Sequence, residues 1–167
     1  MENINRYKVI PRTLVFLFDK DKKKVLLING SSNKKNFANQ YNGIGGHIES
    51  GEGILFAAKR ELSEEAGIED PIALMLCGVM MISKGDDVGI SVYIFKSTLE
   101  KNYVWSSSEG STEWVLLSEI NKLPIVEDLK IILPKIIEWE LGHDLIIVNK
   151  NITKTGEEEI IFEDFIK

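Results

Sequence analysis

Three glutamates grouped near residue 61 are the side chains of this sequence best suited to chemistry. Glu61, Glu64 and Glu65 lie at i, i+3 and i+4, and on a helix this spacing brings three carboxylates onto neighbouring positions of one surface. Their mutual repulsion costs roughly 0.2–0.5 kcal/mol per pair, and Glu64 and Glu65 also face the negative end of the helix dipole. Mg²⁺ would relieve this repulsion, because it binds oxygen ligands and keeps positions open for water and phosphates. The alternative is a solvated acidic helix face.

These carboxylates need a helix to hold them, and the segment 54–66 has the pattern of one. Gly67 follows as a suitable helix C-terminus. Three glycines ahead of the helix, Gly43, Gly45 and Gly46, would let the backbone turn sharply and approach a ligand closely. A stripe of apolar positions is expected to face the core, which would leave the acidic face at the rim of the packed body. The stripe consists of Leu55, Ala58, Leu62 and Ala66.

The rest of the chain has the pattern of a single mixed α/β domain over residues 1–167, without an internal repeat or linker. Apolar runs and period-two alternation predict strands, and one further segment has helical spacing. Two apolar runs in the tail predict a C-terminal hairpin at 143–165. The expected strands are 13–18, 25–28, 72–82, 88–95 and 114–117, and the second helix is 127–141.

Composition narrows the functional classes. The chain has 20 basic and 26 acidic residues and a net charge of −6, which argues against binding of a nucleic-acid polymer through its backbone. Its single cysteine, Cys77, allows no internal disulfide and is expected to be a buried core residue. No signal peptide and no bilayer-length apolar run is recognisable. These features predict a cytoplasmic protein that acts away from membranes.

The glycine loop and the acidic helix together resemble the signature of the Nudix hydrolases. Residues 46–68 read Gx5Ex7REUxEExGU, where U is aliphatic, and no constrained position departs from that pattern. The resemblance implies an α/β/α sandwich with a mixed β-sheet. It also implies hydrolysis of a nucleoside diphosphate linked to a further group.

Carried over position by position, the resemblance implies roles for the residues of this box. Glu61, Glu64 and Glu65 would bind Mg²⁺, with Mn²⁺ as an alternative ion, and the backbone carbonyl of Gly46 would assist. Arg60 would be structural and would pair with Glu52. A plain surface pair between Arg60 and Glu64 is the other interpretation.

A further acidic residue lies outside the box. The stretch EGSTEW at 109–114 resembles a segment of Nudix hydrolases in which a glutamate joins the catalytic centre, and this glutamate matches Glu109. Glu109 lies in a polar stretch, 105–113, which we expect to be a loop, so simple solvation is the alternative. The catalytic base varies within the superfamily, and Glu61 and Glu109 are both candidates.

Other segments resemble the MutT-like enzymes that cleave 8-oxo-dGTP. Asn42, in YNGIGG, matches a residue that contacts the base, although asparagine is also a common turn former. Glu127 or Asp128 matches a residue that reads the purine, and an acidic helix N-terminus explains them equally well. His47 stands where several such enzymes have lysine, and it carries only part of a charge near neutral pH.

The resulting hypothesis is a Mg²⁺-dependent Nudix hydrolase that cleaves a nucleoside triphosphate, such as 8-oxo-dGTP or a related purine, to the monophosphate and pyrophosphate. One alternative is a pyrophosphatase acting on another nucleoside diphosphate derivative, such as ADP-ribose or a capped RNA. A second alternative is a nucleotide sensor without catalysis, which the intact Glu61, Glu64 and Glu65 disfavour. The sequence leaves the oligomeric state open.

Overall fold

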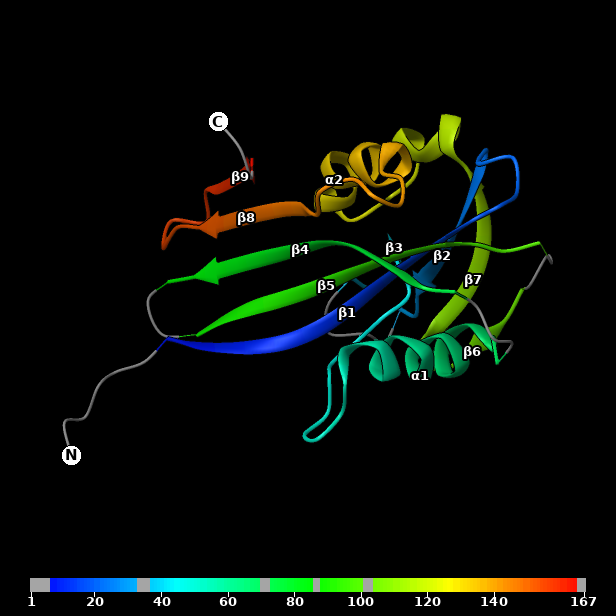
Figure 1. The fold of residues 1–167 in the computed structure, drawn as a ribbon, viewed down its shortest axis with the longest axis horizontal. Coiled ribbons are helices and arrows are strands. Elements are labelled where there is room, and N and C mark those ends of the chain that lie inside the picture. The colour runs from blue at the N-terminus through cyan, green and yellow to red at the C-terminus, as the bar shows by residue number, and fades with distance from the viewer. Residues whose placement is uncertain (1–6, 33–36, 70–72, 86–87, 101–103, 165–167) are drawn as a thin grey trace.

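A mixed β-sheet with a helix on each face forms the body of the protein (Figure 1). The computed structural model describes residues 7–164, apart from 33–36, 70–72, 86–87 and 101–103. Within these residues the strands are β1 Lys8–Phe18, β2 Lys24–Gly30, β3 Tyr41–Asn42, β4 Met75–Lys84, β5 Val88–Thr98, β6 Ser106–Ser107, β7 Gly110–Leu116, β8 Ile146–Ile152 and β9 Glu158–Glu163. The helices are α1 Ile54–Ala66, α2 Glu127–Glu138 and the 3-10 helix η1 Leu117–Lys122.

The strands follow the order β6-β7-β2-β1-β5-β4-β8-β9, and β3 pairs with β2 beside that path. The pairs β1–β5 and β4–β8 are parallel, whereas the other pairs in this order are antiparallel. The predicted mixed sheet and α/β/α sandwich are therefore confirmed. The predicted C-terminal hairpin is also present, as β8 and β9, and it extends the sheet beyond β4.

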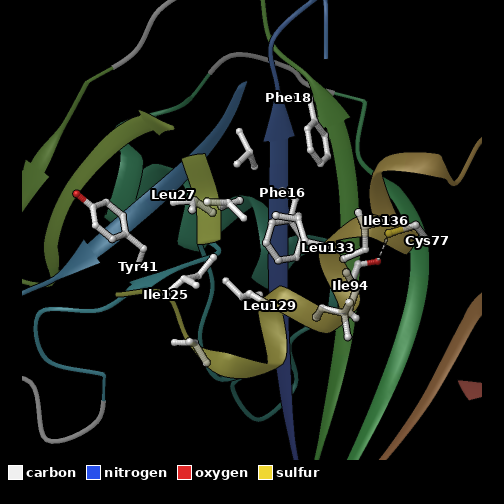
Figure 2. Close-up of a cluster of buried hydrophobic side chains, with 14 of the residues drawn as sticks. Phe16, Phe18, Leu27, Tyr41, Cys77, Ile94, Ile125, Leu129, Leu133 and Ile136 are labelled. Atoms are coloured by element: carbon white, nitrogen blue, oxygen red, sulfur yellow. Dashed lines mark hydrogen bonds between the residues drawn. The ribbon is translucent and has the colours of Figure 1, made fainter. Parts of the chain in front are cut away.

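Strand β1 divides the interior into two cores, because its side chains alternate between the two faces of the sheet. Val15 and Leu17 pack in the cluster that contains Leu62 of α1. Phe16 and Phe18 belong to the cluster on the α2 side, and Figure 2 shows the two rings on this side of β1 with the apolar residues of α2. The two helices are thereby fixed to opposite faces of one strand.

The cysteine prediction is confirmed. Cys77 is fully buried in the α2-side cluster, and its thiol donates a hydrogen bond to the carbonyl of Ile94 at 3.4 Å (Figure 2). Burial raises the pKa of Cys77 to about 12, so the side chain is a neutral thiol at physiological pH.

Helix α1 has the predicted bounds, and Ala58, Leu62 and Ala66 of the predicted stripe are buried, whereas Leu55 is not. Leu55 is 44% exposed, whereas Ala57 is fully buried beside Ala58. Glu61 and Glu65, at 8% and 4% exposed, share this buried side, and Glu64 is exposed. The prediction placed hydrophobic residues inward and acids at the rim. The buried side of the helix holds Leu62 and three alanines, and two of the three carboxylates lie on it with them rather than at the rim.

Helix α2 is shorter than the predicted 127–141 and ends at Glu138, where Trp139 adopts an extended conformation. Pro134 lies inside the helix without ending it. A buried lysine of β5 provides a hydrogen-bond donor for carbonyl groups at the end of the helix. Lys96 is 3% exposed, and its ammonium donates to the carbonyls of Ile137 and Trp139 at 2.9 and 2.5 Å. Among the described residues, neither α1 nor α2 reaches the length and apolar character that a bilayer span requires.

The C-terminus of α1 generates a stability prediction. Gly67 adopts a left-handed conformation, φ +61°, and a Cβ at this position would lie 2.5 Å from the Trp105 ring. Gly51 has φ +83° with open space around it. We expect Gly51→Ala to lose about 1–2 kcal/mol of unfolding free energy through backbone strain alone. Gly67→Ala should lose more, because the Trp105 ring must also move.

Urea denaturation of the two variants measures this difference. The Gly51→Ala variant is the matched control, since it carries the strain without the collision. Equal losses in the two variants would show that Trp105 does not restrain the end of α1.

Candidate functional site

The loop that connects β3 to α1 lies directly against the helix carboxylates. A Cβ on Gly46 would collide with the Glu61 carboxylate, and one on Gly45 would collide with the carbonyl of Thr13. The amide of Gly45 donates to Glu65 Oε2 at 2.9 Å, while the carbonyl of Gly46 accepts the amide of Thr13 at 2.9 Å. Glycine is therefore required at 45 and 46, because the backbone fills the space between β1 and the two carboxylates.

Arg60 fixes the loop to the helix through a fork of hydrogen bonds. Its Nε and Nη2 atoms donate to the two oxygens of Glu52 at 2.9 and 3.1 Å. Its Nη1 atom donates to Glu61 at 2.9 Å and to Glu64 at 3.0 Å, and Nη2 also reaches the carbonyl of His47 at 2.9 Å. The predicted Glu52 pair and the alternative Glu64 pair are thus both present.

The fork also sets the charges around it. The hydrogen bond that Arg60 donates to Glu52 lowers the pKa of Glu52, and the Glu52 carboxylate in turn raises the pKa of Arg60. Burial raises the pKa of Glu61, Arg60 opposes this shift, and repulsion from Glu64 and Glu109 adds to it. The effect of Glu109 on Glu61 shows that these two carboxylates, 48 positions apart in the sequence, are close enough to interact electrostatically.

An acidic cleft of about 430 Å³ opens beside this arrangement, a volume within the range of ligand sites. Glu109 reaches the cleft from the turn between β6 and β7, so the predicted loop at 105–113 contains a short hairpin. Most predicted site residues line the cleft, whereas Arg60, Glu52 and Gly67 are not among its lining residues. Those that line it are Asn42, Gly46, His47, Glu61, Glu64, Glu65 and Glu109.

A smaller, mostly apolar pocket of about 100 Å³ adjoins the cleft on the α2 side of the sheet. Asn42 and Asp128 line it. Asn42 Oδ1 accepts the amide of Gly43 at 2.8 Å, and the side-chain nitrogen of Asn42 is its remaining hydrogen-bond donor. The Asp128 carboxylate accepts a hydrogen bond from Lys150 at 2.5 Å. The two spaces are neighbours, since Arg12, Phe37, Asn42, Gly45 and Gly46 line both.

The predicted substrate residues Glu127 and His47 have different surroundings. Glu127 is exposed, pairs with Lys130 at 2.6 Å, and is not among the residues that line either space. His47 lines the acidic cleft, but burial and the nearby Arg12 lower its pKa, against a smaller opposing effect of Glu49. His47 is therefore a neutral imidazole at pH 7 and supplies no positive charge there.

Sequence reasoning missed Arg12 and Lys150. Arg12 lies in β1 and lines both spaces; its Nε is buried, and no described residue forms a hydrogen bond or ion pair with its guanidinium. Lys150 comes from the C-terminal hairpin. A basic residue just before the apolar run 13–18 was a usable signal for Arg12. No sequence signal identified Lys150, because its partner lies 22 positions earlier on another element.

The donor atoms of the cleft suit a hard divalent cation. They are the carboxylate oxygens of Glu61, Glu64, Glu65 and Glu109 and the carbonyl oxygen of Gly46, without thiolate or imidazole ligands among the predicted set. In the described part of the chain, no three such side chains converge closely enough to enclose an ion by themselves. Mg²⁺ does not require an enclosed site, because it is held by one or two carboxylates and keeps several waters.

Comparison with known families and curated proteins gives two matches to this fold and site. The sequence model of the NUDIX domain matches residues 8–136. An oxidized purine nucleoside triphosphate hydrolase from Danio rerio is 30% identical over 87 residues, which are 52% of this chain and 54% of the relative. The chain thus aligns with about half the length of that curated relative.

Solved structures with the same fold extend the comparison. The MutT protein of Bacillus halodurans is 25% identical, with a TM-score of 0.74, and the match covers 93% of this chain and 98% of that one. The NUDIX domain of Shewanella oneidensis NrtR, solved with ADP ribose, is 18% identical with a TM-score of 0.65, covering 81% and 91% of the two chains. The second match bears on the fold alone.

The Arg60 fork generates a prediction for the loop. Arg60→Lys keeps the charge but cannot form the paired hydrogen bonds to Glu52, so the loop should open more often. We expect amide hydrogen exchange across residues 47–53 to speed up by about tenfold or more. Exchange in β2 should not change.

Lys59→Arg is the matched control, since it alters an exposed neighbour on the same helix. Unchanged exchange across 47–53 in Arg60→Lys would show that the fork does not hold the loop.

Proposed function

The chain belongs to the NUDIX domain family, and on this premise we propose that it is a Mg²⁺-dependent pyrophosphohydrolase of nucleoside triphosphates. Its proposed substrate is 8-oxo-dGTP or a related purine, which it cleaves to the monophosphate and pyrophosphate. The observation that carries the proposal is a pair of adjoining spaces that share lining residues. The space next to α1 is acidic, and the space next to α2 is mostly apolar, with Asn42 and Asp128 in its lining.

The acidic cleft provides the groups that phosphoanhydride hydrolysis needs. Glu61, Glu64, Glu65 and Glu109, with the carbonyl of Gly46, are the residues that would hold the cation. When bound, a divalent ion neutralises charge on the phosphate oxygens and lowers the pKa of an attached water. Glu61 and Glu109 both face the cleft and are both candidates to accept the proton of the attacking water. Arg60 keeps Glu61 and Glu64 in place through its hydrogen bonds.

The apolar pocket suits a purine base. Its lining is mostly hydrophobic, as for the flat faces of an aromatic ring, and polar groups at Asn42 and Asp128 can read the ring's edge. The Asn42 amide donates and the Asp128 carboxylate accepts. A guanine edge presents the complement, an O6 acceptor beside N–H donors. This match supports a guanine-type base.

Arg12 lines both spaces and is suited to the phosphates of the substrate. Several carboxylates line the cleft, so a triphosphate needs a positive side chain besides the metal. Among the described residues that line the cleft, Arg12 alone has a permanent positive charge. Its guanidinium is not engaged by any described carboxylate, so it remains available to bind phosphate oxygens.

The relatives support the same substrate class. The Danio rerio protein is named for hydrolysis of oxidized purine nucleoside triphosphates, and the Bacillus halodurans structure is a MutT protein. A NUDIX domain of the same fold was solved with ADP ribose. ADP-ribose is therefore the comparison substrate in the test.

A substrate panel tests the proposal. With Mg²⁺, the protein should release pyrophosphate from 8-oxo-dGTP and related purine triphosphates in preference to ADP-ribose or capped RNA. Glu65→Gln should lower kcat by more than about 100-fold, because loss of a ligand costs more than loss of a residue supporting one.

Two results contradict different parts of the proposal. Turnover of ADP-ribose or capped RNA alone would refute the substrate class and leave the hydrolase. Nucleotide binding without turnover of any compound by the wild-type protein would indicate a sensor instead.

The role of Arg12 generates a separate prediction. Arg12→Gln should raise the KM for the triphosphate about tenfold or more, since a charge-assisted hydrogen bond is lost. Arg12→Lys should restore part of the affinity, because it keeps the charge. Lys8→Gln, an exposed change on the same strand, is the control. A KM for Arg12→Gln equal to that of the control would exclude phosphate binding by Arg12.

A further inference from the structure

The C-terminal hairpin, which lies outside the matched NUDIX segment, places a lysine beside two residues that line the apolar pocket. That segment ends at residue 136, whereas β8 runs from Ile146 to Ile152 and pairs in parallel with β4. Lys150 of β8 lies beside Ile82 of β4 in the sheet, and Ile82 lines the apolar pocket. The hairpin thereby places Lys150 next to the pocket wall.

Lys150 is buried in an ion pair with the pocket acid. It is 6% exposed, and its Nζ lies 2.5 Å from Asp128 Oδ1 and 2.8 Å from Glu158 Oε2. Burial lowers the pKa of Lys150, but the hydrogen bonds to Asp128 and Glu158 outweigh it and leave a net rise. Lys150 is therefore a charged ammonium, and it meets Asp128 at the edge of the pocket.

We propose that Lys150 is a specificity-determining positioning residue that holds the Asp128 carboxylate in place as a hydrogen-bond acceptor for the base. The inference rests on the proposed function, because it assigns the apolar pocket to the base of a nucleotide. It makes the C-terminal hairpin part of substrate selection.

The selectivity follows from hydrogen-bond chemistry. An ionised carboxylate only accepts, whereas a protonated one also donates. With Asp128 fixed as an acceptor and Asn42 as a donor, the pocket matches a guanine edge. An adenine edge presents a ring-nitrogen acceptor beside its amino group, so the carboxylate meets a lone pair. Without Lys150, the Asp128 carboxylate would lose its charged partner beside a mostly apolar pocket and would turn away from the base.

Binding of two matched monophosphates, measured by calorimetry without metal, tests the inference separately from catalysis. The probes are 8-oxo-dGMP and 8-oxo-dAMP, which differ in the base edge that Asn42 and Asp128 would read. The wild-type protein should prefer 8-oxo-dGMP. Lys150→Met should weaken 8-oxo-dGMP binding about tenfold or more and change 8-oxo-dAMP binding less than about twofold, so that the preference is lost.

Three further variants separate positioning from stability. Lys150→Arg should restore the preference, because it keeps the charge. Val148→Ala, a buried change in the same strand, should lower the unfolding midpoint while the preference persists. Lys150→Gln keeps a donor without the charge and should lose the preference too, which provides a second variant if Lys150→Met does not fold.

The outcomes distinguish this inference from the proposed reaction. Any of three results overturns the inference. The preference for 8-oxo-dGMP could persist in a folded Lys150→Met or Lys150→Gln variant, Val148→Ala could lose that preference equally, or the wild-type protein could show no preference. If the preference depends on Lys150 but no triphosphate is hydrolysed, the inference stands and the proposed reaction fails. If triphosphates are hydrolysed and the variants keep the preference, the reaction stands and the inference fails.

Discussion

Repulsion among carboxylates gathered at one cleft is the constraint on which the site depends. Glu61 and Glu65 lie on the buried side of α1 together with its small residues, and Glu109 reaches the cleft from the β6–β7 turn. Such a group holds its shape only if its negative charge is partly met by the protein. The Arg60 fork and the Gly45 amide provide this partial compensation. A divalent cation bound there, as proposed, would offset further negative charge.

Strand β1 divides the interior of the molecule, and this division explains how an acidic cleft and an apolar pocket come to adjoin each other. Alternation along this strand directs one set of side chains toward α1 and the other toward α2. The acidic groups gather on the first side and the apolar pocket forms on the second. The two sides meet at Gly45 and Gly46, which line both spaces. A side chain on either glycine would collide with β1 or with Glu61, so the absence of side chains there is what brings the two spaces together.

Local features were predictable from the sequence, and distant pairings were not. The bounds of α1 and the terminal hairpin follow from patterns within short segments, because spacing and turn residues act over a few positions. The buried face of α1 was wrong at Leu55, since small residues at 57 and 58 allow a closer approach to the sheet than a leucine stripe would. Lys96 and Lys150 were missed because each meets partners on another element, and a single sequence does not show which elements become neighbours. The glutamates of α1 were predicted as site residues because their motif places them within a short stretch of the sequence.

The Lys150–Asp128 pair is better explained by specificity than by stability. Burying two charges costs several kcal/mol per ion before their attraction repays it, and well-packed apolar residues often serve stability equally well. The strand around Lys150 already packs through Val148, which is fully buried, so the hairpin has an apolar attachment of its own. A buried ammonium adds a fixed charge at a fixed place, which an apolar residue cannot supply. Here that place is next to the acid that lines the pocket, where a carboxylate held in position would, under the proposed function, select the base edge that binds.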